Sequence, residues 1–290
     1  MSGFWIVLTG ALVASCCAIL GCFLILRRMA LIGDAISHAV LPGIAIAFLM
    51  SGTRDSIFML LGAAAFGFIA VFLIEMFRSG GVQSDASIGV VFTALFAVGV
   101  VLISLNARNI DLDLDCVLFG EIAYVQWSTL EIGGADLGPK AVWLLGFTLV
   151  VILLVISLFY KQFKLTSFDP ALAAALGIPV ALFHYVLMGL VSMASVSSFE
   201  SVGAILVVGL LIIPPAAAYL LTDRLGLMLV ISVAVGIVSS IAGYGAAVAL
   251  DASIAGCMVC AAGVLFAAAF LLSPKHGLLA LRRARSRAAA

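Results

Sequence analysis

The chain has 290 residues, of which 65% are hydrophobic and 10% are charged, and its formal net charge is zero. A mean hydropathy of +1.34 excludes a soluble globular domain and predicts an integral membrane protein. The balanced charge gives no electrostatic reason to expect nucleic acid as a partner.

The apolar runs predict an all-α fold: a polytopic membrane helix bundle of about nine spans, with eight as the alternative count. Each run is close to the ~20 residues that a bilayer crossing needs. The first run has no basic region before it and no cleavage site leading to a polar chain, so it is interpreted as a span rather than a signal peptide. The expected spans cover about 4–26, 29–50, 56–77, 86–105, 141–160, 179–198, 202–221, 226–249 and 253–272.

The basic residues predict the orientation, because cytoplasmic loops carry an excess of Lys and Arg. With the N-terminus outside, 11 of the 14 basic residues fall at cytoplasmic ends. The predicted division is a transmembrane domain over 1–274 and a basic cytoplasmic tail over 275–290. The three outer basic residues are Arg54, Arg108 and Lys140.

The most informative stretch is Gly33–Gly43, with the sequence GDAISHAVLPG inside the second apolar run. Asp34 and His38 are four residues apart, so a helix places them on one face. Pro42 has no N–H, so the carbonyl of His38 loses its helical partner. Polar groups in a membrane mark a path or a site, and this donor set suits a divalent transition metal. The alternative is a hydrogen-bonded pair that only packs two helices together.

The longest break between spans is the outer segment 106–140. Asp111, Asp113 and Asp115 alternate with leucines there, which indicates a solvated acidic rim, because the glycine and glutamate of a calcium loop are missing. Aromatic residues in 117–132 predict a helix lying at the membrane interface. Together these segments form an outer surface where a partner can dock.

The segment Ser167–Pro179, which is expected on the cytoplasmic side, carries signals for the start and the end of a helix. Asp169 is a good N-cap, Pro170 suits the first helical position, and Gly177 suits a left-handed C-cap. The sequence therefore predicts a short helix over 169–177, either a plain connector or a helix that docks into a partner's groove. Its apolar edge consists of Phe168, Leu172 and Leu176.

Four other features leave alternatives open. Glu200 is expected at the outer end of the sixth span, either as a cap on the next helix or as a candidate outer gate. Pro214 and Pro215 indicate a broken helix beside a pathway or a packing kink. His184 stands alone in its span and is expected to be satisfied structurally rather than to act as a ligand. No disulfide framework is predicted from the six cysteines.

With these motifs in view, the chain resembles the permease subunits of manganese/zinc/iron ABC importers. The resemblance rests on three motifs spread over most of the chain: Arg28–Gly43, Ser167–Pro170 with Gly177, and Ser201–Pro214. The wording SHAVLPG is similar to the manganese branch of the family. The long outer loop is similar to one subunit type from systems with two different permeases.

The resemblance implies a multi-pass protein of the cell (inner) membrane, surrounded by lipid, with a cytoplasmic C-terminus. It implies a second permease copy or paralogue, ABC ATPase subunits and an extracytoplasmic metal-binding protein. The family's metal-path residues fall on Asp34 and His38, and its ATPase-coupling helix falls on Asp169–Gly177. It implies no cofactor: manganese is the favoured transported ion, with zinc and iron as the other candidates.

Two other classes of membrane protein are alternatives to an ABC permease. The chain has no Gly-rich phosphate loop with Lys and Ser/Thr, so it is predicted to be no enzyme and to take its energy from another source. An ion-gradient-driven secondary metal transporter is the alternative, although it normally shows more intramembrane carboxylates. An intramembrane metallo-hydrolase would need a motif such as H-E-x-x-H, which is absent.

Overall fold

The structure is a computed structural model that describes residues 2–51, 56–106, 122–132 and 135–273. In these segments it has nine helices, counting the interrupted second span once, that are long and apolar enough to cross a membrane. The prediction of an all-α membrane bundle with about nine spans is confirmed. The basic tail, the acidic rim and Cys116 lie outside the described residues.

The spans begin and end within a few residues of their predicted limits. They are α1 (Ser2–Leu26), α2 (Ile32–Ala39) with α3 (Leu41–Ser51), α4 (Ser56–Ser79), α5 (Ser84–Asn106), α7 (Lys140–Leu158), α10 (Val180–Val202), α11 (Ala204–Leu221), α12 (Leu225–Leu250) and α13 (Ile254–Leu272). The shorter elements are the 3₁₀ helix η1 (Ile122–Trp127), the strands β1 (Thr129–Ile132) and β2 (Ala135–Pro139), and the helices α8 (Tyr160–Phe168) and α9 (Pro170–Ala175).

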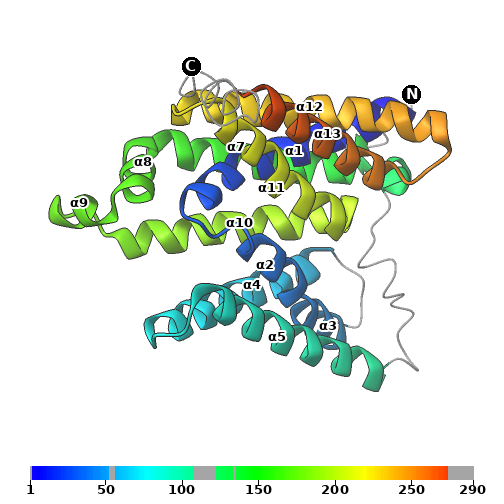
Figure 1. The fold of residues 1–290 in the computed structure, drawn as a ribbon. Coiled ribbons are helices and arrows are strands. Elements are labelled where there is room, and N and C mark those ends of the chain that lie inside the picture. Colours follow the sequence, from blue (N-terminus) through cyan, green and yellow to red (C-terminus); the bar gives the residue numbers. More distant parts are fainter. Residues whose placement is uncertain (1, 52–55, 107–121, 133–134, 274–290) are drawn as a thin grey trace, which may run out of the picture.

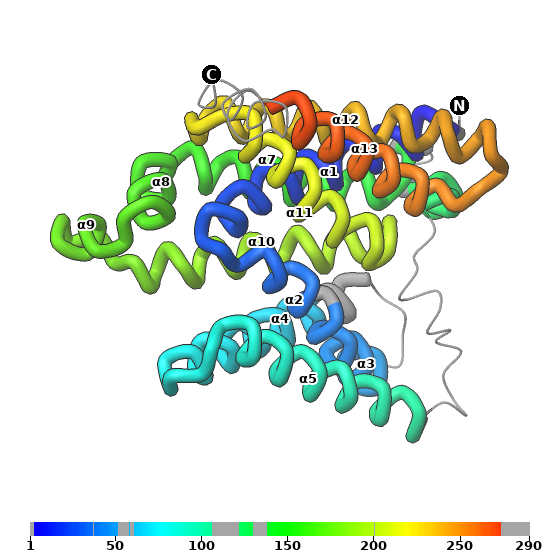
Figure 2. Tube along the Cα trace, in the orientation of Figure 1, coloured from blue at the N-terminus to red at the C-terminus, as the bar shows by residue number. Residues whose placement is uncertain are grey.

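The helices form two groups with α2 between them (Figures 1 and 2). Helices α3, α4 and α5 pack on one another, while α1, α7 and α10 to α13 form the larger group. The short α2 contacts α4 and α5 on one side and α10 and α11 on the other. The helix that carries Asp34 and His38 therefore lies between the two groups of helices and contacts both.

Helices α3 and α4 approach closely because glycines face each other. A Cβ on Gly43 would clash with the carbonyl of Gly62, and a Cβ on Gly62 would clash with the carbonyl of Gly43. Small residues at such crossings let two membrane helices pack by direct backbone contact.

We expect Gly62→Val to destabilise the purified protein by about 1–3 kcal/mol, because overpacking forces the two backbones apart. Gly146→Val is the matched control, since a Cβ at Gly146 meets nothing within 4 Å. Thermal unfolding in detergent should show a lower Tm for the first variant only. Equal Tm values for both variants would contradict this account of the α3–α4 contact.

Helix α11 is continuous although it contains Pro214 and Pro215, so the first of the two interpretations, a broken helix, is wrong. The missing N–H of Pro215 frees the carbonyl of Leu211, four residues earlier. That carbonyl and the Pro215 ring lie directly against Gly21 of α1, where a Cβ would clash with both. The prolines therefore serve helix packing, the second of the two interpretations.

The predicted interfacial helix over 117–132 is wrong in its described part. Residues 122–127 form the single 3₁₀ segment η1, and an antiparallel hairpin of β1 and β2 follows. Tyr124 and Trp127 are exposed while Ile122 and Val125 are buried in the bundle. The two buried residues are three positions apart, which is one turn of a 3₁₀ helix, so this short segment contacts the bundle along a single face.

Candidate functional site

The second span is interrupted directly after the polar pair. Helix α2 ends at Ala39, Val40 forms a turn, and α3 begins at Leu41. Pro42 lies in the first turn of α3, where a missing N–H leaves no bond unmade within that helix. Asp34 lies in the first turn of α2, where the helix dipole favours a negative charge.

The two polar side chains come together as their spacing predicted. His38 Nε2 lies 3.5 Å from Asp34 Oδ1. Two ligands bound to one ion at a tetrahedral angle, with bonds near 2.1 Å, lie about 3.4 Å apart. The side chains of His38 and Asp34 are 24% and 41% exposed, so this pair is open on one side in the single chain.

The imidazole of His38 is held by aromatic rings of α5. Its ring centroid lies 5.3 Å from that of Phe92 and 5.5 Å from that of Phe96. Its Nδ1 atom is buried and has no hydrogen-bond partner among the described residues. A buried polar atom without a partner is unfavourable, so hydrogen bonding at Nδ1 does not fix the ring. Packing against the two phenylalanine rings positions it, with Nε2 directed at Asp34. Among the described residues there is no cluster of three or more His, Cys, Asp and Glu side chains.

The predicted short helix is present as α9, with both predicted ends. Asp169 Oδ1 accepts a hydrogen bond of 2.9 Å from the backbone N–H of Leu172. Gly177 has a φ of +76°, and the N–H groups of Gly177 and Ile178 donate to the carbonyls of Ala174 and Ala173. This is the Schellman arrangement that ends a helix at a left-handed residue.

The apolar edge of α9 faces outward. Figure 1 shows α8 and α9 projecting from one end of the bundle. Ala173 is buried against the protein, whereas the three apolar residues of the predicted edge are exposed. Those residues are Phe168, Leu172 and Leu176.

The end of α8 is fastened to the end of α1 by Arg27, which the sequence did not indicate. Its Nε donates to Ser167 Oγ at 3.1 Å and its Nη2 donates to Thr166 Oγ1 at 2.9 Å. Burial lowers the pKa of Arg27 to about 10, so the guanidinium still carries its charge at neutral pH. The base of the α8–α9 projection is therefore held rigidly to the first span.

Glu200 lies in the last turn of α10, and its side chain is outside the described part, so an outer gate stays a prediction. The five described cysteines are free.

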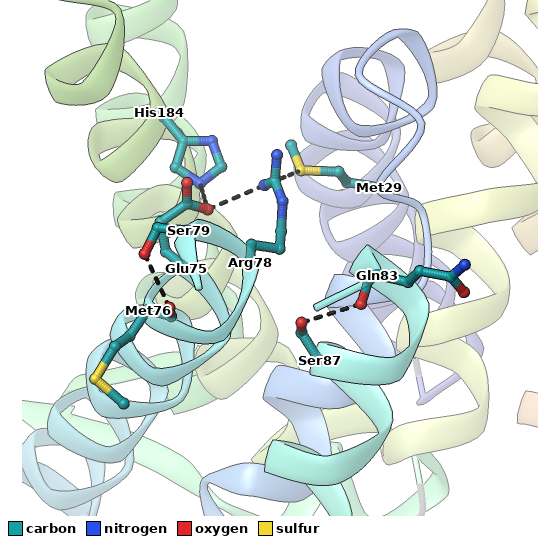
Figure 3. Close-up of polar contacts among 8 residues, drawn as sticks. All are labelled: Met29, Glu75, Met76, Arg78, Ser79, Gln83, Ser87 and His184. Carbon is teal, nitrogen blue, oxygen red and sulfur yellow. Dashed lines mark hydrogen bonds and ion pairs between the residues drawn. The ribbon is translucent and has the colours of Figure 1, made fainter. Parts of the chain in front are cut away.

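The structure contains a second carboxylate–imidazole pair that the sequence did not predict (Figure 3). Glu75 of α4 lies 3.4 Å from His184 of α10 and accepts a 3.0 Å hydrogen bond from Arg78. The expectation that His184 is satisfied structurally is confirmed, and its partner is Glu75. The available signal was weak: both residues lie near the ends of their spans that the sequence predicts to be cytoplasmic, but nothing in the sequence paired those two spans.

The comparisons with known proteins agree with the motifs. A family model described as the ABC 3 transport family matches residues 3–273. The chain is 54% identical over 275 residues to the manganese transport system membrane protein MntD of Bacillus subtilis, covering 95% of this chain and 93% of that protein. It is 45% identical over 275 residues to the zinc transport system membrane protein TroD of Treponema pallidum, covering 94% of this chain and 75% of that protein. The solved structure of PsaBC from Streptococcus pneumoniae in complex with Fab aligns with a TM-score of 0.79 and 34% identity, covering 96% and 94% of the two chains. The chain therefore belongs to the ABC 3 transport family.

Proposed function

We propose that this chain is the membrane-spanning permease of an importer that carries a divalent transition metal into the cytoplasm, manganese foremost. The observation that carries the proposal is the Asp34–His38 pair, held at ligand spacing on the central helix α2. The names of the relatives support the class of cargo, since MntD is a manganese and TroD a zinc transport protein. Zinc and iron are the other ions that this donor set accepts.

The ion would bind to Asp34 and to the Nε2 atom of His38. The buried Nδ1 would carry the ring proton, which leaves the lone pair on Nε2 for the metal. The carboxylate must be ionised and the imidazole neutral for this, because a proton on either competes with the cation. A site of few ligands also suits transport, because the ion has to leave again.

A second permease chain would complete the site. One chain provides two side-chain ligands, and the 41% exposure of Asp34 leaves room on one side. Doubling the pair across a dimer gives four ligands, the number that zinc adopts in closed sites. We assign the dimer partner, a copy or a paralogue, to the face on which Asp34 is open.

The energy would come from an ATPase subunit docked on α9. The caps define both ends of the short helix α9, and its exposed apolar edge suits a hydrophobic groove on a partner. An extracytoplasmic metal-binding protein would deliver the ion at the opposite end, and the C-terminal tail would face the cytoplasm. The chain itself would hydrolyse no ATP, since it has no phosphate-binding loop.

Reconstitution tests this function directly. We expect proteoliposomes that contain the permease, its ATPase and the delivering protein to take up radiolabelled manganese only when ATP is hydrolysed. Ionophores that collapse proton and sodium gradients should leave the rate unchanged. Uptake that follows an imposed gradient without ATP would favour the secondary transporter, and uptake of magnesium at the manganese rate would contradict the assigned class of cargo.

A further inference from the structure

The Glu75–His184 pair repeats the chemistry of the Asp34–His38 pair. Each pair has one carboxylate and one imidazole, and the O···N distances are 3.4 Å and 3.5 Å. Both distances match the separation of about 3.4 Å expected for two ligands on one tetrahedral ion. The second pair is contributed by two helices, α4 and α10, so it depends on how these helices sit against each other.

The second pair lies near the ends of α4 and α10 that are predicted to be cytoplasmic. Glu75 is in the last turns of α4, and His184 is in the second turn of α10, which follows directly after α9. The Glu75 and His184 side chains are 32% and 13% exposed, so the pair is partly accessible in the single chain. Both α4 and α10 contact α2, the helix of the first pair, so an ion moving from Asp34 along these helices toward their predicted cytoplasmic ends would reach this carboxylate.

Arg78 occupies the place that a cation would take. Its Nη1 atom lies 3.0 Å from Glu75 Oε2 and 3.6 Å from the thioether sulfur of Met29 (Figure 3). A half-buried carboxylate in a membrane protein needs a positive partner, and the guanidinium provides it here. The single nitrogen is thus enclosed by a carboxylate oxygen and a sulfur, with the imidazole of His184 bound to the same oxygen.

We propose that Glu75 and His184 form a second, transient site for a divalent transition metal on the cytoplasmic side of Asp34, with Arg78 as a tethered cation that replaces the departing ion. Oxygen, nitrogen and sulfur donors favour a transition metal over magnesium or calcium. Arg27 and Arg78 both place positive charge near His184, which keeps the affinity for a further cation low. A weak site next to the exit promotes release rather than storage.

The same contacts are compatible with a purely structural tie between α4 and α10, and the two roles differ in one respect. If the contacts only hold α4 and α10 together, removing Arg78 weakens the contact between these helices and gives no gain in metal binding. If they form a cation site, removing Arg78 raises the affinity for a metal ion, because the competing guanidinium is gone. The identity of the ion rests on the proposed function, but binding itself is measured without transport.

The test uses the purified permease–ATPase complex without nucleotide and follows manganese binding by electron paramagnetic resonance, which detects free hexaaqua Mn²⁺. Asp34→Asn removes the first site. We expect the double variant Asp34→Asn/Arg78→Gln to bind manganese at least about tenfold more tightly than the triple variant that adds Glu75→Gln, since tenfold is the smallest loss typical of mutating only an outer partner of a metal ligand. Adding His184→Gln instead should have a similar effect. Asp34→Asn/Arg78→Lys, which keeps a positive charge at this position, should bind manganese no more tightly than Asp34→Asn alone.

Two outcomes would overturn the proposal: no gain in binding when Arg78 is removed, or a gain that survives both Glu75→Gln and His184→Gln. Arg78→Met, which keeps most of the side-chain volume, replaces Arg78→Gln if that variant does not elute as a folded complex. Metal binding that follows the expected pattern, together with an importer that does not take up manganese, would contradict the proposed function and leave this site standing.

Discussion

Replacing Asp34 by Asn is expected to reduce manganese uptake by about 100-fold or more, because the change keeps the shape of the side chain and removes its charge. Disturbing only the supports of a metal ligand already reduces affinity or activity 10–100-fold. His38→Ala removes the nitrogen that lies 3.5 Å from Asp34 and should have an effect of the same size. Radiolabelled manganese and zinc uptake in cells at matched expression measures both.

Asp85→Asn is the matched control, since Asp85 also lies in the first turn of a helix, α5, and its side chain is exposed. It should retain the wild-type rate. The two site variants should reach the membrane in normal amounts, because neither residue belongs to the buried apolar core. Wild-type uptake by both site variants would show that the pair only packs helices.

Much of this architecture follows from local sequence, for reasons that particular elements make clear. The spans are continuous apolar runs bounded by charged or turn residues, so length alone separates them. Helix α9 was predictable to the residue because capping is local: Asp169 reaches its own first turn and Gly177 takes the left-handed conformation at its own end. The Asp34–His38 contact is equally local, since four residues on one helix fix it.

The features that the sequence did not predict depend on tertiary packing. The partner of His184 is on α4, and the residues that Arg27 binds are on α8, so neither contact leaves a trace in local spacing. Pro214 and Pro215 suggested a break, but whether a proline interrupts a membrane helix depends on what lies against the freed carbonyl. Here Gly21 allows α1 to approach it closely. The hairpin of β1 and β2 was not predicted, because two short strands carry no apolar periodicity.

Gly177→Val is expected to reduce coupled uptake about 5–30-fold, the factor that one to two kcal/mol makes in a two-state ratio. Gly177 has a φ of +76°, and a side chain in the left-handed region carries a penalty of roughly 1–2 kcal/mol. A Cβ there meets nothing within 4 Å, so the effect arises from the backbone alone and not from a clash. The C-terminal end of α9 would unwind, and the apolar edge that includes Leu172 and Leu176 would lose its fixed direction.

Gly177→Asn is the matched control for this prediction, because Asn tolerates the left-handed conformation far better than a β-branched residue. Both variants should insert into the membrane normally and bind manganese like the wild type, since Asp34 and His38 are on another helix. Only Gly177→Val should lose manganese uptake and co-purify with less ATPase subunit. Equal uptake by the two variants would mean that the geometry of α9 does not carry the coupling, and the docking surface would then have to lie elsewhere on the face that is predicted to be cytoplasmic.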